Sequence, residues 1–424
     1  MDQSVVITLG FLVFAIIMFA WEKIPLSITA MIVAVGLHLT GVLSAKAAFA
    51  GFVDTNVLLF MGMFIVGAAF FETGLAVEVG NLVTKVAKTE TRLIIAIMMI
   101  TGLLSGFLSN TGTAAVLIPV VIGICKKANF SQTRMMMPLV FAAAMGGNIS
   151  LIGAPGNMIA QAGLQQAGLQ GFEFFDYGKI GLPMLIVGTI FYATIGKRFL
   201  PTTPSRTPDA SYQGNDDYSH IPSWKKWIAG LVLVGTVAAM IFEKELGVKL
   251  YVSAWIGALI LVATNVITET AAIKSIDMKT IMLFAGSLAL GDAMVKTGTG
   301  SVIADTVVAM LGTSPEPLVL LVVIFILSVF MTNFMSNTAT CALLVPIGLS
   351  LANQLGFDPK AVLAAIVVGS SLAYATPIGM PANTMVYNIA GYSFMDYVKA
   401  GIPLIVVSMI VSLILLPILF PFHP

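Results

Sequence analysis

The chain has 424 residues, of which 58% are hydrophobic and only 10% are charged, and its mean hydropathy is +0.99. A soluble chain carries about a quarter charged residues, so this composition excludes a soluble domain and indicates a polytopic membrane protein. The net charge of +1 gives no sign of nucleic-acid binding, and two isolated Cys residues argue against disulfide frameworks and cysteine-based metal sites.

Uninterrupted apolar runs of about 20 residues predict membrane-spanning helices. In chain order they are 4–21, 24–43, 53–72, 178–199, 225–242, 250–267, 279–293 and 400–420. The first run follows Met-Asp-Gln-Ser rather than a basic segment, so it is expected to be a membrane helix and not a cleaved signal peptide. Short amphipathic helices are expected at 75–88 and 298–311.

Two longer apolar stretches are interrupted by the same polar triplet. Ser-Asn-Thr stands at 109–111 inside the stretch 93–125, and again at 336–338 inside the stretch 317–350. Each stretch is too long for one spanning helix. The triplet therefore predicts the tip of a re-entrant hairpin, which enters and leaves the membrane on one side.

Two further apolar stretches carry a Gly-x-Pro-x-Asn motif. It occupies 153–157 within the stretch 135–165 and 379–383 within the stretch 361–391. Gly and Pro interrupt a helix, so the motif predicts two broken helices whose backbone opens inside the membrane.

The paired interruptions indicate an internal duplication. Residues 108–119 (LSNTGTAAVLIP) match residues 335–346 (MSNTATCALLVP). The pattern divides the chain into two repeats, 1–200 and 224–424, joined by a polar linker at 201–223 that is rich in Pro, Ser, Thr and Asp. Five crossings in each repeat would turn the second repeat upside down relative to the first, giving two inverted repeats of five transmembrane helices.

The orientation follows from the basic residues. If the N-terminus lies outside the cell, most of the 21 Lys and Arg residues fall in loops on the inner side. We therefore expect a multi-pass protein of the plasma membrane with both termini outside and the linker in the cytoplasm.

The four interruptions are the expected functional site. Non-helical backbone at membrane depth must be surrounded by protein or by a water-filled cavity. A Ser-Asn-Thr tip offers hydroxyl, amide and main-chain oxygens that suit a sodium ion, while the helix after it directs N–H groups toward an anion. The interrupted stretches contain no Asp, Glu, Lys, Arg or His. Anion binding should therefore depend on a coupling cation, and a proton antiporter is disfavoured.

On these motifs the chain resembles the divalent-anion:sodium symporter family of the ion transporter superfamily, over nearly its whole length. Paired Ser-Asn-Thr tips are the hallmark of that family. The resemblance implies a homodimer surrounded by lipid, in which a scaffold domain stays fixed and a transport domain moves like an elevator. It implies sodium as the coupling ion, with no cofactor and no nucleic-acid partner.

The resemblance also implies the ligands. The first sodium site would comprise Ser105, Ser109, Asn110 and the carbonyl of Gly153. The second would comprise Thr332, the carbonyl of Met335, Asn337 and Gly379. The substrate would contact Asn110, Thr111, Pro155, Asn337, Thr338, Met380 and Pro381.

One departure from that family concerns the substrate. Its dicarboxylate-carrying members usually have a small residue followed by Thr-Pro in both broken helices, where this chain has Ala154-Pro155 and Met380-Pro381. The sequence thus predicts a secondary transporter, not an enzyme, that imports a small anion with sodium, most simply a di- or tricarboxylate. A permease for sulfate- or arsenite-like anions, a monocarboxylate carrier and an anion exchanger stay open. A channel fits less well because apolar residues flank both tips.

Overall fold

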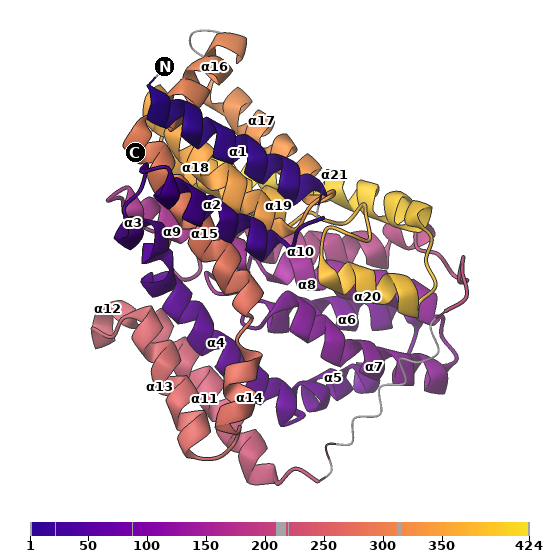
Figure 1. The fold of residues 1–424 in the computed structure, drawn as a ribbon. Coiled ribbons are helices and arrows are strands. Elements are labelled where there is room, and N and C mark those ends of the chain that lie inside the picture. The colour runs from indigo at the N-terminus through magenta and orange to yellow at the C-terminus, as the bar shows by residue number, and fades with distance from the viewer. Residues whose placement is uncertain are drawn as a thin grey trace.

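The computed structural model describes residues 2–21, 23–86, 88–208, 218, 220–311 and 316–422. Within these ranges every regular element is a helix and no strand occurs, which confirms the expected all-helical class (Figure 1). Ten residues of the predicted linker, 209–217 and 219, lie outside the described residues.

The helices of the first half follow the predicted order. They are α1 (Gln3–Trp21), α2 (Leu26–Leu39), α3 (Ala45–Phe49), η1 (Ala50–Val53), α4 (Thr55–Glu72), α5 (Leu75–Val86), α6 (Glu90–Ser105), α7 (Asn110–Ala128), α8 (Gln132–Gly146), α9 (Pro155–Gln166), α10 (Gly178–Ala193) and η2 (Gly196–Arg198).

The second half repeats much of this order. Its helices are α11 (Ser223–Ile241), α12 (Glu243–Leu246), α13 (Leu250–Ala263), α14 (Glu269–Ser275), α15 (Met278–Thr297), α16 (Thr299–Leu311), α17 (Pro317–Thr332), α18 (Asn337–Leu355), α19 (Pro359–Ser370), α20 (Pro381–Ile389) and α21 (Phe394–Leu419). The short helices α5 and α16 each precede a hairpin, formed by α6 and α7 in the first half and by α17 and α18 in the second.

The broken helices differ from the prediction in where they break. The non-helical segments are 147–154 and 371–380, and the chain becomes helical again at Pro155 and Pro381. The Pro-x-Asn part of each motif was expected in the break and instead belongs to the first turn of α9 or α20. Proline is accommodated there because the first helical N–H has no partner within the helix.

Glycine permits the two breaks to lie close to neighbouring helices. A Cβ on Gly181 of α10 would lie 2.1 Å from the Asn148 carbonyl oxygen, and one on Gly401 of α21 would lie 2.0 Å from that of Tyr374. No other residue fits at this distance, so both glycines hold the non-helical backbone against a long helix. This contact gives a structural reason for the Asp-Tyr-x-Lys-x-Gly-x-Pro sequence that both halves share.

The helices pack in two groups. In one group α2 packs along α15, α4 packs along α13, and α1 and α11 lie beside them. In the other, the hairpins and broken helices interlock across the two halves, with α7 against α20 and α18 against α9, while α10 pairs with α21. α15 is the main bridge between the groups because it also contacts α9 and α18.

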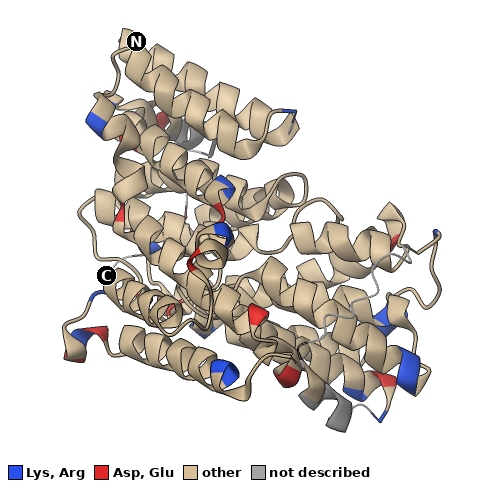
Figure 2. Ribbon diagram, turned by 60° about the horizontal axis from the view of Figure 1, so that its bottom comes forward, with Lys and Arg blue, Asp and Glu red and all other residues tan. Residues whose placement is uncertain are grey.

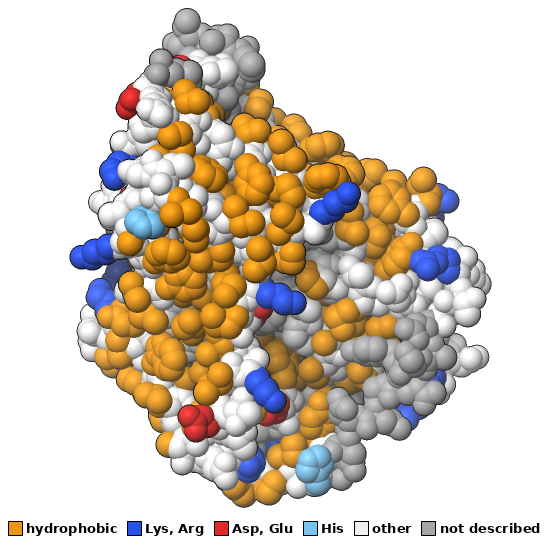
Figure 3. Space-filling view, in the orientation of Figure 1, with side chains coloured by type: hydrophobic (Ala, Val, Ile, Leu, Met, Phe, Trp, Pro, Cys, Tyr) orange, Lys and Arg blue, Asp and Glu red, His pale blue; other side chains and the backbone are white. Residues whose placement is uncertain are grey.

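Length and composition support a membrane fold. Seven helical segments in the described chain are long and apolar enough to cross a membrane: Gln3–Trp21, Ala45–Glu72, Asn110–Ala128, Ser223–Ile241, Met278–Thr297, Asn337–Leu355 and Phe394–Leu419. The face shown in Figure 3 is largely hydrophobic, and the charged residues lie mostly near helix ends (Figure 2). By contrast α8 and α19 are buried along almost their whole length, as expected of helices apolar on all sides.

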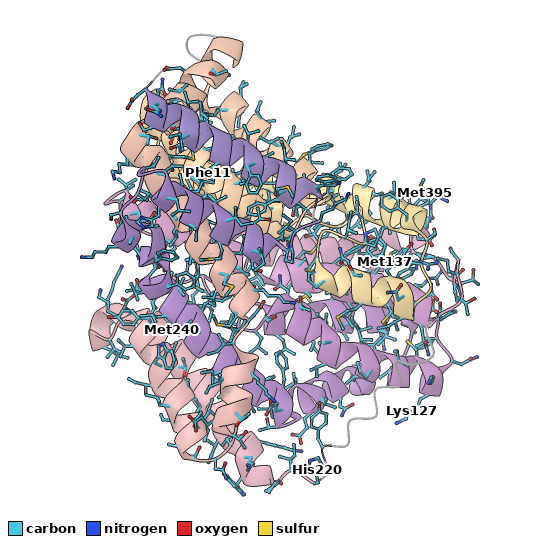
Figure 4. All side chains as sticks on the ribbon, viewed as in Figure 1. Phe11, Lys127, Met137, His220, Met240 and Met395 are labelled. Atoms are coloured by element: carbon cyan, nitrogen blue, oxygen red, sulfur yellow. The ribbon has the colours of Figure 1, made fainter. Side chains whose placement is uncertain are left out.

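Both termini lie at the same end of the molecule (Figure 1). Lys127, in the last turn of α7, and Met395, in the first turn of α21, are labelled on the opposite flank (Figure 4). An even number of crossings is consistent with this arrangement.

Candidate functional site: a cavity at four helix breaks

The interruptions of both halves meet at one cavity of about 610 Å³. Both Ser-Asn-Thr tips and both Gly-x-Pro segments line it, as do Phe60, Phe64, Phe71 and Phe107. Segments separated by more than 200 residues in the sequence therefore share one space. Its walls combine polar helix ends with aromatic rings, which is the usual composition of a small-molecule site.

Three oxygen-bearing groups surround the amide of Asn110 at the first tip. Ser105 Oγ lies 2.7 Å from both the amide oxygen and the Ala143 carbonyl oxygen, and its single hydrogen can be donated to either. The Asn110 amide atom that faces Ser105 also lies 3.2 Å from the Ala143 carbonyl oxygen and 3.3 Å from the Gly153 carbonyl oxygen. Ser105 is fully buried behind the tip, whereas Asn110 and Gly153 line the cavity.

The second tip reproduces the cluster. Thr332 Oγ1 lies 2.8 Å from the Asn337 amide oxygen and also within hydrogen-bond distance of the Ser370 carbonyl, and its single hydrogen can be donated to either. The same terminal amide position lies 3.2 Å from the Ser370 carbonyl oxygen and 3.1 Å from that of Gly379. Thr332 is fully buried, like its counterpart Ser105.

The oxygens of each cluster can find partners in one of two ways, depending on the orientation of the asparagine amide. If the amide nitrogen of Asn110 or Asn337 faces the cluster, it donates to all three neighbouring oxygens. If the amide oxygen faces it, four oxygens converge with a single hydroxyl hydrogen among them, and a cation would remove the remaining repulsion. Neutral hydroxyl, amide and carbonyl oxygens are ligands suited to hard cations. The clusters therefore fit a sodium ion by their donor set.

The helix N-termini at the cavity favour an anion. α7 and α18 are capped by Ser109 and Ser336, whose hydroxyls accept hydrogen bonds from Gly112 N–H at 3.2 Å and Ala339 N–H at 3.1 Å. Ala154 and Met380 occupy the N-cap positions of α9 and α20. Neither helix has a side-chain hydrogen bond at its N-cap among the described residues. N–H groups left without a cap at a helix N-terminus are available to a negatively charged ligand.

Two asparagines fix the shape of the breaks. Asn157 Nδ2 donates to the carbonyls of Gly147 and Ser150, both at 2.8 Å. Asn383 Nδ2 donates in the same way to Ala373 at 2.7 Å and Thr376 at 3.2 Å. These bonds supply partners to main-chain carbonyls that a helix would otherwise satisfy, which is required of buried backbone.

The family follows from comparison with known proteins. The family model described as citrate transporter (CitMHS) matches residues 16–342 and 237–422, which together span nearly the whole chain. The chain belongs to the citrate transporter family. It is therefore a multi-pass membrane transporter and not an enzyme, and the expected relationship to the ion transporter superfamily is confirmed.

Similar proteins are also transporters. An uncharacterized transporter from Haemophilus influenzae is 29% identical over 425 residues, covering 95% of this chain and 89% of the other. The sodium-dependent dicarboxylate transporter SdcS of Staphylococcus saprophyticus is 25% identical over 435 residues, covering 94% and 83%. The crystal structure of the Alcanivorax borkumensis YdaH transporter superposes with a TM-score of 0.67 at 17% identity, covering 98% and 99%, and shares the fold.

The predicted site residues fall into two sets. The cavity is lined by the following: Ser109, Asn110, Thr111, Gly153, Pro155, Asn337, Thr338, Gly379, Met380 and Pro381. Ser105 and Thr332 lie behind the tips, in contact with Asn110 and Asn337. Met335 is buried beside the second tip and does not line the cavity.

Sequence reasoning missed several participants. It did not single out the Ala143 and Ser370 carbonyls, which end α8 and α19 beside the clusters, because a main-chain oxygen leaves no mark in a sequence. It treated Asn157 and Asn383 as parts of a motif without a role, although their recurrence was a usable signal.

Proposed function

We propose that this transporter is a sodium-coupled symporter of a small anion, most simply a di- or tricarboxylate. The duplicated oxygen clusters at Asn110 and Asn337 carry the proposal. Two sequence-distant tips have the same four-oxygen arrangement, which two sodium ions would satisfy. The helix N-termini around the same cavity would hold the anion without any charged side chain from the interrupted stretches.

In this proposal Ser105, Ser109, Asn110 and Gly153 hold the first sodium ion. Thr332, Met335, Asn337 and Gly379 hold the second. The anion would contact Asn110, Thr111, Pro155, Asn337, Thr338, Met380 and Pro381. Because the cations complete the electrostatics of the cavity, the anion should bind weakly without sodium. The relatives named sodium-dependent dicarboxylate transporter support sodium as the coupling ion and a dicarboxylate as the substrate.

The packing supports transport by alternating access. The hairpins, the broken helices, α10 and α21 form one contact group, and α1, α2, α4, α11, α13 and α15 form another. We infer that the first group is the moving transport domain and the second the scaffold, which would carry the dimer contact. The repeats 1–200 and 224–424 are proposed to be inverted, with both termini outside and the linker 201–223 inside.

A second candidate is an inorganic-anion permease or exchanger. The observation in its favour is the pair Ala154 and Met380, which provide no hydroxyl at the start of α9 and α20. A compact anion such as sulfate would need fewer such donors than a dicarboxylate.

The test is uptake into proteoliposomes. Radiolabelled succinate, citrate and sulfate would each be offered with an inward sodium gradient, with an equal potassium gradient, and with sodium on both sides. Saturable succinate or citrate uptake that requires the sodium gradient is expected. Uptake that is equally fast with a potassium gradient would indicate uniport instead of sodium symport. Uptake that occurs only when the liposomes contain an anion would indicate exchange.

A further inference from the structure

The cavity wall formed by the proposed scaffold helices α2 and α15, together with α14, has charged side chains. The wall formed by the Ser-Asn-Thr tips has none. Ser27 at the start of α2 and Ser275, Asp277, Lys279 and Thr280 at the junction of α14 and α15 line the cavity. Asp277 and Lys279 are its only charged lining residues among those described. The side of the proposed scaffold thus presents two oppositely charged side chains to a cavity whose other described lining residues are uncharged.

The two charges are not equally available. Asp277 Oδ1 accepts from the backbone N–H of Lys279 at 3.1 Å and of Thr280 at 3.4 Å, and Oδ2 accepts from Thr280 Oγ1 at 2.6 Å. Its negative charge is therefore engaged by the N-terminus of α15. The Lys279 side chain is exposed and makes no ion pair within the described part of the chain. Lys279 is therefore the charged group of this wall that is free to turn toward an anion in the cavity.

The corresponding position in the first half is closed. Asn56 follows the N-cap Asp54 of α4 just as Lys279 follows Asp277 of α15. Asn56 is buried, and its amide donates to Asp54 at 3.0 Å and to Gln165 of α9 at 2.8 Å. The first-half position thus ties the two helix groups together, whereas its second-half counterpart faces open space in the cavity.

We propose that Lys279 is a specificity-determining residue that attracts and orients the anion on the side where the cavity opens. This inference rests on the proposed function. Lys279 would act from the scaffold, so the anion would interact with it only while the transport domain is in the conformation seen here. Its contribution grows with the charge of the substrate, because Coulomb energy is proportional to the product of the charges.

The test is anion affinity of the purified full-length protein, measured from thermal stabilisation by succinate and by citrate at fixed sodium. Lys279→Gln should raise the apparent dissociation constant about two- to fivefold, the range of an exposed charge pair. Lys279→Glu should raise it further, and Lys279→Arg should retain wild-type affinity. The loss should be larger for citrate than for succinate, and it should shrink as choline chloride is added, because salt screens exposed charges.

Lys274→Gln is the matched control. Lys274 is an exposed lysine on neighbouring α14 that does not line the cavity, so its removal should leave both affinities unchanged. Wild-type affinity and salt dependence in Lys279→Gln and Lys279→Glu would overturn this inference alone. Wild-type protein that binds these anions equally with and without sodium would overturn the sodium coupling, while the Lys279 comparison would still be decided. Wild-type protein stabilised by neither anion would overturn both.

Discussion

The two Ser-Asn-Thr tips differ in sequence on both sides of the triplet and yet have nearly the same geometry. Each asparagine amide faces a hydroxyl one turn before the triplet, the last carbonyls of a buried helix, and a glycine carbonyl from a break. The hydroxyl comes from Ser105 in one half and Thr332 in the other. The comparison indicates that the two tips share an arrangement of oxygens rather than an identical set of neighbouring residues.

Removing the tip amides should have the largest effect. In Asn110→Ala or Asn337→Ala, each cluster loses the one side-chain oxygen that can turn toward a cation. We expect sodium-dependent anion uptake to fall more than about tenfold in each variant, the scale of one or two charge-assisted hydrogen bonds. The remaining uptake should depend on sodium with lower cooperativity, since one site would persist.

The control for this pair is Asn353→Ala, an exposed asparagine at the other end of α18. It should transport like the wild type. If Asn110→Ala and Asn337→Ala left the sodium dependence unchanged, the clusters would not be cation sites.

The asparagines of the breaks should affect stability before activity. Asn157→Ala and Asn383→Ala each deprive two buried carbonyls of their donor. An unsatisfied buried group costs about 1–3 kcal/mol, so the melting temperature in detergent should fall clearly in both variants. Asn388→Ala, an exposed position on the same helix as Asn383, should melt like the wild type. A large fall in only one of the two variants would mean that the breaks are not equivalent.

The sequence predicted what depends on pattern and missed what depends on main-chain position. Long apolar runs predicted the apolar helices, and the repeated motifs predicted residues that line the cavity. The starts of α9 and α20 were misplaced because the motif contains both a break signal and a helix-starting proline. Lys279 could not be found from its sequence context, since a lysine at the start of a membrane helix is also expected from the positive-inside rule.

Exchanging the two hydroxyl residues tests whether the tips tolerate each other's chemistry. Ser105→Thr and Thr332→Ser keep a hydroxyl at each cluster, so uptake should stay within about twofold of the wild type. Ser105→Ala and Thr332→Ala should raise the sodium concentration for half-maximal uptake several-fold, because about 1 kcal/mol is lost with one hydrogen-bonding group. A defect in the exchanged variants as severe as in the alanine variants would show that the shape around the hydroxyl matters as much as the oxygen.

The smallest effect is expected where the two halves differ most, at the residue before each helix-starting proline. Ala154 and Met380 both have extended backbone, with φ of −144° and −146°, which threonine adopts without strain. A threonine hydroxyl there could accept a hydrogen bond from the first turn of the helix and donate its own hydrogen to a carboxylate. We expect Met380→Thr and Ala154→Thr each to lower the half-saturating succinate concentration about two- to threefold, as for one added hydrogen bond of modest net strength.

Met380→Ala removes the thioether without adding a hydroxyl, so it separates the effect of bulk from that of hydrogen bonding. Competition of succinate uptake by sulfate would measure the change in preference. If the threonine variants favoured sulfate over succinate, the second candidate function would gain and the role assigned to these hydroxyls would be wrong.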